Sequence, residues 1–171
     1  LEEVLTTMGP IADEQKVTLE LVTNDPDTLV CADAVRLGQI LLNLMSNAIK
    51  FNEEGGRVTL KSRETPGRVV IEVTDTGMGI PGAELVNIFD EFNQLNQTSA
   101  RARSGTGLGL TLSRRLARGM GGTVAVTSEM GVGSTFTVTL PSGSPAVIEV
   151  PAPMVRLAVK VAAIDEASVP A

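Results

Sequence analysis

The sequence of 171 residues contains no histidine, no tryptophan and no tyrosine, and it has one cysteine. Without histidine, the chain cannot form a Ser-His-Asp triad or a histidine metal site, and it cannot carry a phosphohistidine itself. The lone Cys31 cannot form an internal disulfide, so we expect a small buried thiol in a reducing compartment. No stretch approaches the roughly 20 apolar residues of a membrane-spanning helix. We therefore expect no membrane contact by this segment.

The charge balance is acidic, with 14 Lys and Arg against 20 Asp and Glu and a net charge of −6. A hydrophobic fraction of 43% is too high for a disordered chain and predicts one globular domain. The acidic balance gives no general attraction to nucleic acid, so we expect none as a partner. The chain begins at Leu1 and has no signal peptide. We therefore expect a cytoplasmic segment of a longer polypeptide, and the intact protein could be anchored in a membrane.

Periodicity and turn residues divide the chain into alternating helices and strands. Residues 1–14 are expected to form one helix or two short ones, with Gly9-Pro10 as a break. Further helices are expected at 33–51 with Asp33 as the N-cap, at 84–90 and at 108–120. Strands are expected at 17–22, 28–32, 57–64, 68–75, 123–128 and 134–140, the last four as two hairpins. Residues 91–106 are polar and aperiodic, which indicates a loop of functional length. After Pro141 the composition changes to Ser, Pro and Ala, so the domain is expected to end there.

The helix at 33–51 carries a narrow polar wedge. At 100° per residue, five polar side chains lie within about 80° of its surface, and almost everything else on the helix is apolar. The five are Arg36, Gln39, Asn43, Asn47 and Lys50. Taken alone, the wedge is either an exposed stripe or the floor of a site. Amide oxygens suit Mg²⁺ and a lysine suits phosphate, which favours the site.

Two glycine-rich turns add to this wedge. Asp75-Thr76-Gly77-Met78-Gly79 follows a strand, where glycines allow a close approach to a flat ligand and a carboxylate accepts from an amine. Gly105–Leu110 opens a helix, a geometry that favours phosphate. No acid occurs between Asn93 and Ser128, and Arg101 and Arg103 lie on the loop before this helix. Three further arginines are expected only to cover the surface of the helix: Arg114, Arg115 and Arg118.

These elements, in this order and spacing, resemble the catalytic and ATP-binding domain of sensor histidine kinases, in the GHKL superfamily. The resemblance covers residues 1–141 and rests on four motifs: an N box at Asn43–Phe51, a G1 box at Asp75–Gly79, an F box at Phe89–Phe92 and a G2 box at Gly105–Leu110. It implies an α+β fold, a two-layer α/β sandwich with a mixed, mostly antiparallel sheet on helices and a mobile ATP lid at 91–106.

The resemblance also implies ATP and Mg²⁺ as cofactors and assigns the site residues. Asp75 would accept from the adenine amino group, with Gly77, Gly79, Ile80, Phe51 and Thr135 nearby. Asn47 would coordinate Mg²⁺ with help from Asn43. The catalytic set would be Asn43, Lys50, Arg101 and Arg103, and the G2 box would add Gly105, Thr106, Gly107, Leu108, Gly109 and Leu110.

Asn43 favours phosphoryl transfer over hydrolysis, because hydrolytic relatives of the superfamily carry a glutamate there and an amide cannot act as a base. The acceptor histidine would lie on an upstream dimerisation domain of the same homodimeric polypeptide, for relay to a cognate response regulator or a fused receiver domain. Residues 1–14 would be the end of a linker helix, 15–141 the catalytic domain, and 142–171 a linker or the start of a receiver-like domain. The alternatives are a nucleotide-sensing scaffold and, third, a hydrolase.

Overall fold

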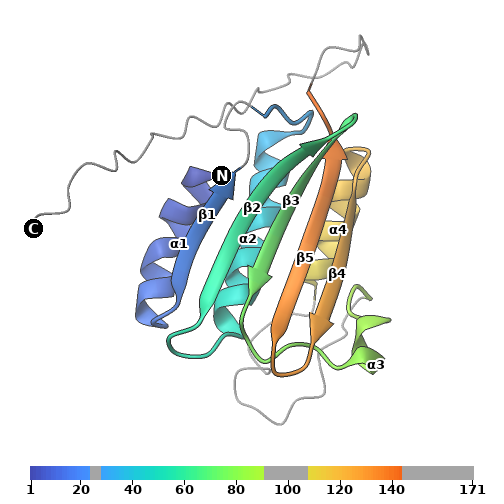
Figure 1. The fold of residues 1–171 in the computed structure, drawn as a ribbon. Helices are drawn as coiled ribbons and strands as arrows, with labels where there is room; N and C mark the ends of the chain where they lie inside the picture. The colour runs from blue at the N-terminus through green and yellow to red at the C-terminus, as the bar shows by residue number, and fades with distance from the viewer. Residues whose placement is uncertain (24–27, 91–107, 144–171) are drawn as a thin grey trace, which may run out of the picture.

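The computed structural model describes residues 1–23, 28–90 and 108–143, which form one sheet with helices on one of its faces (Figure 1). The sheet order is β1-β2-β3-β5-β4; β1 and β2 are parallel and the other neighbours are antiparallel. The strands are β1 (Thr18–Thr23), β2 (Arg57–Thr65), β3 (Arg68–Asp75), β4 (Thr123–Glu129) and β5 (Gly133–Pro141). The helices are α1 (Glu2–Glu14), α2 (Ala34–Lys50), α3 (Gly82–Leu85) and α4 (Gly109–Gly119). The predicted α+β sandwich with a mixed, mostly antiparallel sheet is confirmed.

Helix α2 forms because its ends and its spacing agree. The Asp33 side chain accepts a hydrogen bond from the Arg36 N–H at 3.0 Å and so caps the first turn, as predicted. Buried side chains then recur three and four residues apart along one face: Leu37, Ile40, Leu41, Leu44, Met45, Ala48 and Ile49. This face lies on the sheet, and the polar wedge therefore points away from it.

The strands of the sheet alternate inward and outward residues. In β2 the buried positions are Val58, Leu60 and Ser62, and in β5 they include Phe136, Val138 and Leu140. Pro66-Gly67 joins β2 to β3 in a two-residue turn, as this dipeptide favours. The alternation places the apolar half of each strand against the helices.

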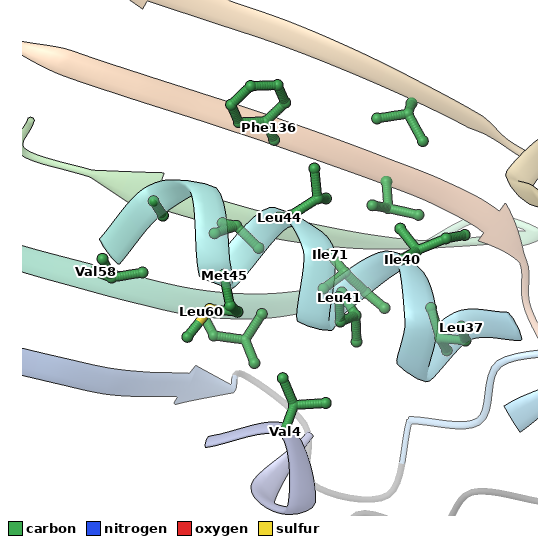
Figure 2. Close-up of a cluster of buried hydrophobic side chains, with 14 of the residues drawn as sticks. Val4, Leu37, Ile40, Leu41, Leu44, Met45, Val58, Leu60, Ile71 and Phe136 are labelled. Carbon is green, nitrogen blue, oxygen red and sulfur yellow. The ribbon is translucent and has the colours of Figure 1, made fainter. Parts of the chain in front are cut away.

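The inward side chains of the helices and the sheet form one hydrophobic core (Figure 2). Leu44 of α2 points to the sheet beside Phe136, and Met45 lies over Leu60 in the same view. Ile40, Leu44 and Leu60 have no measurable exposure to solvent. Helix α2 is thus the central element of the core.

Helix α1 is continuous, so residues 1–14 form one helix, the first of the two alternatives, and the chain does not break at Gly9-Pro10. Pro10 cannot donate a backbone hydrogen bond to the preceding turn. The helix persists because Val4, Met8 and Ala12 are buried in the common core against α2 and β1. This packing favours counting α1 with the catalytic domain rather than with a linker, and we propose the boundary accordingly.

Two other sequence predictions need correction. Residues 28–32 do not form a strand; within the described chain only an isolated bridge joins Val30 to Ser142. The segment pairs with the chain leaving β5, through Cys31 N–H to the Pro141 carbonyl at 3.0 Å, and Asp33 then starts α2. The helix expected at 84–90 is α3, which ends at Leu85 and continues as turns. Among the described residues, no helix has the length and apolar character needed to cross a membrane.

The core position of α2 gives a stability prediction. Leu44→Ala is expected to lower the free energy of unfolding by about 2–5 kcal/mol, because it leaves a cavity under the sheet. The same change at Leu112, which is 41% exposed on α4, is expected to cost no more than about 0.5 kcal/mol. Urea unfolding followed by circular dichroism measures both, since the chain has no Trp or Tyr. Equal losses would contradict the placement of α2 in the core.

Candidate functional site

Asp75 is a buried carboxylate at the end of β3, 7% exposed. Its Oδ1 accepts hydrogen bonds from the Gly77 N–H at 2.9 Å and the Ser134 N–H at 3.2 Å. Burial raises the pKa of Asp75, while these two bonds and one from the Ser134 side chain oppose the rise. A desolvated acceptor that is held by neighbouring donors suits the recognition of an amino group.

The turn after Asp75 is fixed between α2 and the β4–β5 turn. The Met78 N–H donates to the Phe51 carbonyl at 3.3 Å, and the Gly131 N–H donates to the Met78 carbonyl at 2.8 Å. A Cβ on Gly77 would clash with the Phe51 carbonyl. Gly79 has a φ of +70°, and a Cβ there would clash with the Glu129 carbonyl. Both glycines are therefore needed for this turn to reach its position.

Sequence reasoning missed a polar network that joins the end of α2 to this turn. Asn52 is buried, and its Nδ2 donates to the Arg57 carbonyl at 2.9 Å. The Thr76 hydroxyl accepts from the Arg57 N–H at 2.9 Å and donates to Asn52 Oδ1 at 3.3 Å. The only hint in the sequence was the turn-forming run that follows the helix. The network fixes the distance between Lys50 and the Asp75 turn.

The polar wedge of α2 lies on its uncovered side. Arg36 and Gln39 are exposed, and Asn43, Asn47 and Lys50 are half-buried. Lys50 Nζ lies 4.7 Å from the centre of the Phe51 ring, a cation–π distance. Partial burial lowers the pKa of Lys50. The wedge therefore leads along α2 toward the Asp75 turn and is not a plain solvated stripe.

Asn43 connects α2 to α4. Its Nδ2 donates to the Ser113 hydroxyl at 3.0 Å, and its Oδ1 lies against Gly109, where a Cβ would clash. Ser113 is 1% exposed. Because both ends of the Asn43 amide face α4, the expected help with Mg²⁺ coordination does not fit this geometry. Asn43 instead fixes the start of α4 on the N-box helix.

The F box is fixed to α4 as well. The Thr111 hydroxyl donates to the Phe89 carbonyl at 2.8 Å. The Arg114 guanidinium lies 5.1 Å from the centre of the Phe89 ring and 3.9 Å from Asp90 Oδ1. Arg114 therefore contacts the F box, whereas the sequence had predicted that it only covers the surface of α4.

Thr135 does not lie beside Asp75, so that expectation is wrong. Its hydroxyl is 3.0 Å from the Thr74 hydroxyl, and both residues belong to the face of the sheet opposite to Asp75. Ser134, one residue earlier, is paired with Asp75 and contacts it. The register between β3 and β5 decides this, and the sequence alone did not specify it.

Of the other residues expected in the site, the structure describes some and not others. Ile80 is buried and Leu108 is exposed, and Gly109 and Leu110 lie at the start of α4. The other predicted residues lie outside the described part of the chain: Arg101, Arg103, Gly105, Thr106 and Gly107. The predicted lid lies there too.

The described geometry combines a buried carboxylate, close-approach glycines and a polar helix face beside a sheet. The sequence model of the family "Histidine kinase-, DNA gyrase B-, and HSP90-like ATPase" matches residues 32–144. The chain belongs to this ATPase family. Within the family it is a catalytic ATP-binding domain of the sensor histidine kinase type.

Relatives and solved structures support the same assignment. The circadian input-output histidine kinase CikA of Synechococcus elongatus is 43% identical over 103 residues, which are 60% of this chain and 14% of CikA. Full-length ShkA in complex with AMPPNP is 36% identical, with a TM-score of 0.74 over 85% of this chain and 30% of ShkA. The catalytic domain of histidine kinase ThkA is 27% identical, with a TM-score of 0.72 over 82% of this chain and 90% of that domain. ThkA has also been solved in complex with the response regulator protein TrrA. The chain thus spans a small part of its curated relative.

The buried charge of Asp75 gives a prediction for the nucleotide-free domain. Because the pKa of Asp75 is raised on folding, its contribution to stability is lost as the pH rises through the folded pKa. Asp75→Asn keeps the acceptor for the two N–H groups and removes the charge, so it is expected to raise the melting temperature at pH 7.5. The gain should shrink as the pH falls through that pKa. Thermal melts from pH 4 to 8 measure it.

Asp13→Asn is the matched control, because it makes the same change on the exposed side of α1. Its effect is expected to stay within about 0.5 kcal/mol. A loss of stability in Asp75→Asn at pH 7.5 would contradict a net cost of the buried charge.

Proposed function

We propose that this domain binds Mg²⁺-ATP and transfers its γ-phosphate to a histidine that lies elsewhere in a longer polypeptide. One observation carries the proposal: the buried Asp75 carboxylate is linked through the Phe51 carbonyl to the polar side of α2. A nucleotide laid along this line would meet an acceptor at its base and a lysine and amides at its phosphates.

At the adenine end, the carboxylate of Asp75 would accept from the 6-amino group. Gly77 and Gly79 would admit the ring edge, because no side chain projects from them, and Ile80 and Phe51 would supply apolar contact. Ser134 takes the place that we had expected for Thr135, since it contacts Asp75 directly. Recognition at this end supplies affinity and the choice of base.

At the phosphate end, Lys50, Arg101 and Arg103 would neutralise phosphate charge, and the G2 box would add contacts to the phosphates. The described residues contain no group of three His, Cys, Asp or Glu side chains that could hold a metal ion. A Mg²⁺ ion at this site would therefore be held largely by phosphate and water, with Asn47 as a protein ligand. Asn47 would hold the ion through its amide oxygen. When bound, Mg²⁺ would supply charge neutralisation to the transferring phosphoryl group.

Transfer is favoured over hydrolysis by the state of Asn43. An amide cannot take a proton from water near neutral pH, and here its nitrogen is bound to Ser113. The site would therefore position and neutralise phosphates without activating water.

The acceptor and the partners are proposed from the absence of histidine in this chain. We propose an acceptor histidine on a dimerisation domain of the same homodimeric polypeptide, and relay to a response regulator or a fused receiver domain. The solved complex of ThkA with TrrA supports a response regulator as the partner. Residues 144–171 lie outside the described part of the chain, and we propose them as a linker or the start of a receiver-like domain.

Titration with a fluorescent ATP analogue tests the nucleotide site. Asp75→Asn is expected to weaken binding at least about tenfold, because a charged acceptor to the base is lost, whereas Asp13→Asn should bind like the unchanged chain. Omission of Mg²⁺ should weaken binding further in the unchanged chain, and Asn47→Ala should reduce this dependence on Mg²⁺. Equal binding by the Asp75 variant would contradict the site.

Labelling of a longer protein that contains the upstream helices tests the transfer. Phosphate from γ-labelled ATP is expected to appear as an acid-labile phosphohistidine, and Asn47→Asp should abolish it. Tight ATP binding without any labelling would favour the nucleotide-sensing scaffold. Steady ATP turnover by the isolated domain would favour a hydrolase instead.

A further inference from the structure

Ser128, near the end of β4, lies at the centre of a hydrogen-bond network behind Asp75. Its hydroxyl accepts from the Ile80 N–H at 2.8 Å. It donates to the Gly133 carbonyl at 2.8 Å, and it lies 3.0 Å from the Ser134 hydroxyl. Ser128 therefore touches both the turn after Asp75 and the residue that contacts the carboxylate.

The protons in this network can be counted. A serine hydroxyl donates once and accepts twice. When Asp75 is ionised, the Ser134 hydroxyl donates a hydrogen bond to the carboxylate, since a bond to a charged acceptor is stronger than a bond to a neutral one. The Ser128 hydroxyl accepts from the Ile80 N–H and donates its one proton to the Gly133 carbonyl. The N–H of the same peptide unit, that of Ser134, donates to Asp75 Oδ1. The dipoles of the three donors point in one direction, toward Asp75, and such chains strengthen each member.

The network matters because an ionised Asp75 is a stronger acceptor for an amino group than a protonated one. Burial works against ionisation, and the hydrogen bonds of Gly77 and Ser134 work for it. The charged side chains on the flanking elements are Lys50 on α2, Arg57 on β2 and Glu129 on β4, and none of them is among the causes that shift the pKa of Asp75. Hydrogen bonds alone thus oppose burial within the described residues.

We propose that Ser128 is a positioning residue of the nucleotide site, which holds the Gly133–Ser134 peptide so that the Ser134 N–H points to Asp75, and which fixes Ile80 in the adjoining turn. This proposal rests on the proposed role of Asp75 in binding adenine. It makes base recognition depend on a side chain that does not itself contact Asp75 through any described bond. It also assigns a role to β4, the strand at the edge of the sheet.

The first test needs no nucleotide. The carboxyl carbon of Asp75 is titrated by ¹³C NMR in the 171-residue chain and in Ser128→Ala. Loss of the Ser128 hydroxyl is expected to move the titration midpoint of Asp75 to higher pH, and Ser128→Thr, which keeps a hydroxyl, should restore it. Thr127→Val removes a hydroxyl from the opposite face of the same strand and should leave the midpoint unchanged. An unchanged or lowered midpoint in Ser128→Ala would overturn the proposal.

The second test uses two nucleotides at pH 7.5. Ser128→Ala is expected to weaken ATP binding about fivefold, the effect of one ordinary hydrogen bond. The same substitution should weaken the binding of purine riboside triphosphate much less, because this nucleotide lacks the amino group. Equal losses for both nucleotides would reduce Ser128 to a structural residue and overturn the proposal.

Two precautions keep the tests decisive. If Ser128→Ala does not fold, Ser128→Thr and Ser128→Val are compared, because they differ only in hydroxyl against methyl; identical midpoints in these two would overturn the proposal. Failure of the proposed function is seen separately, as ATP binding that is insensitive to Asp75→Asn. The NMR titration still reports on Ser128 in that case.

Discussion

The packing of α2 on the sheet is the constraint on which the rest of the structure depends. One side of this helix is apolar and fully buried, with Ile40 and Leu44 under β3 and β5 (Figure 2). The opposite side must then face away from the sheet, and it carries Asn47 and Lys50. Because Asp75 ends a strand of the same sheet, core packing also fixes the distance between the amides of α2 and the carboxylate. The site is therefore a consequence of the core and does not need a separate framework.

The second constraint is the buried charge. Asp75 would be more stable in the fold as a neutral group, since burial raises its pKa and hydrogen bonds offset only part of that rise. The surrounding turn is built to hold it nevertheless, through Gly77, Ser134 and the contact of Gly79 with the β4–β5 turn. The buried charge of Asp75 lowers stability, and it lies in a turn where side chains at Gly77 and Gly79 would clash. A destabilising charge in such a place is typical of a binding position.

Local features of the sequence predicted most of the fold. The Asp33 cap, the helix α2 and the hairpin of β2 and β3 depend mainly on neighbours along the chain, and they were predicted correctly. Residues 28–32 have strand composition but pair only through the Val30–Ser142 bridge, which no local pattern reveals. The same limit applies in the site. The wedge and Asp75 were visible in the sequence, whereas the choice of Ser134 over Thr135 depends on register, and the Asn43–Ser113 bond depends on how two helices pack.

The topology places the site at one end of the sheet. Figure 1 shows the β2–β3 turn, Leu1 and the end of β5 at one end of the domain, and α3 at the other, close to where β3 ends. Asp75 ends β3, so it lies at the end of the sheet opposite to Leu1 and the end of β5. The site itself combines the buried Asp75 carboxylate with the polar side of α2, and the packing of α2 on the sheet brings these two groups together.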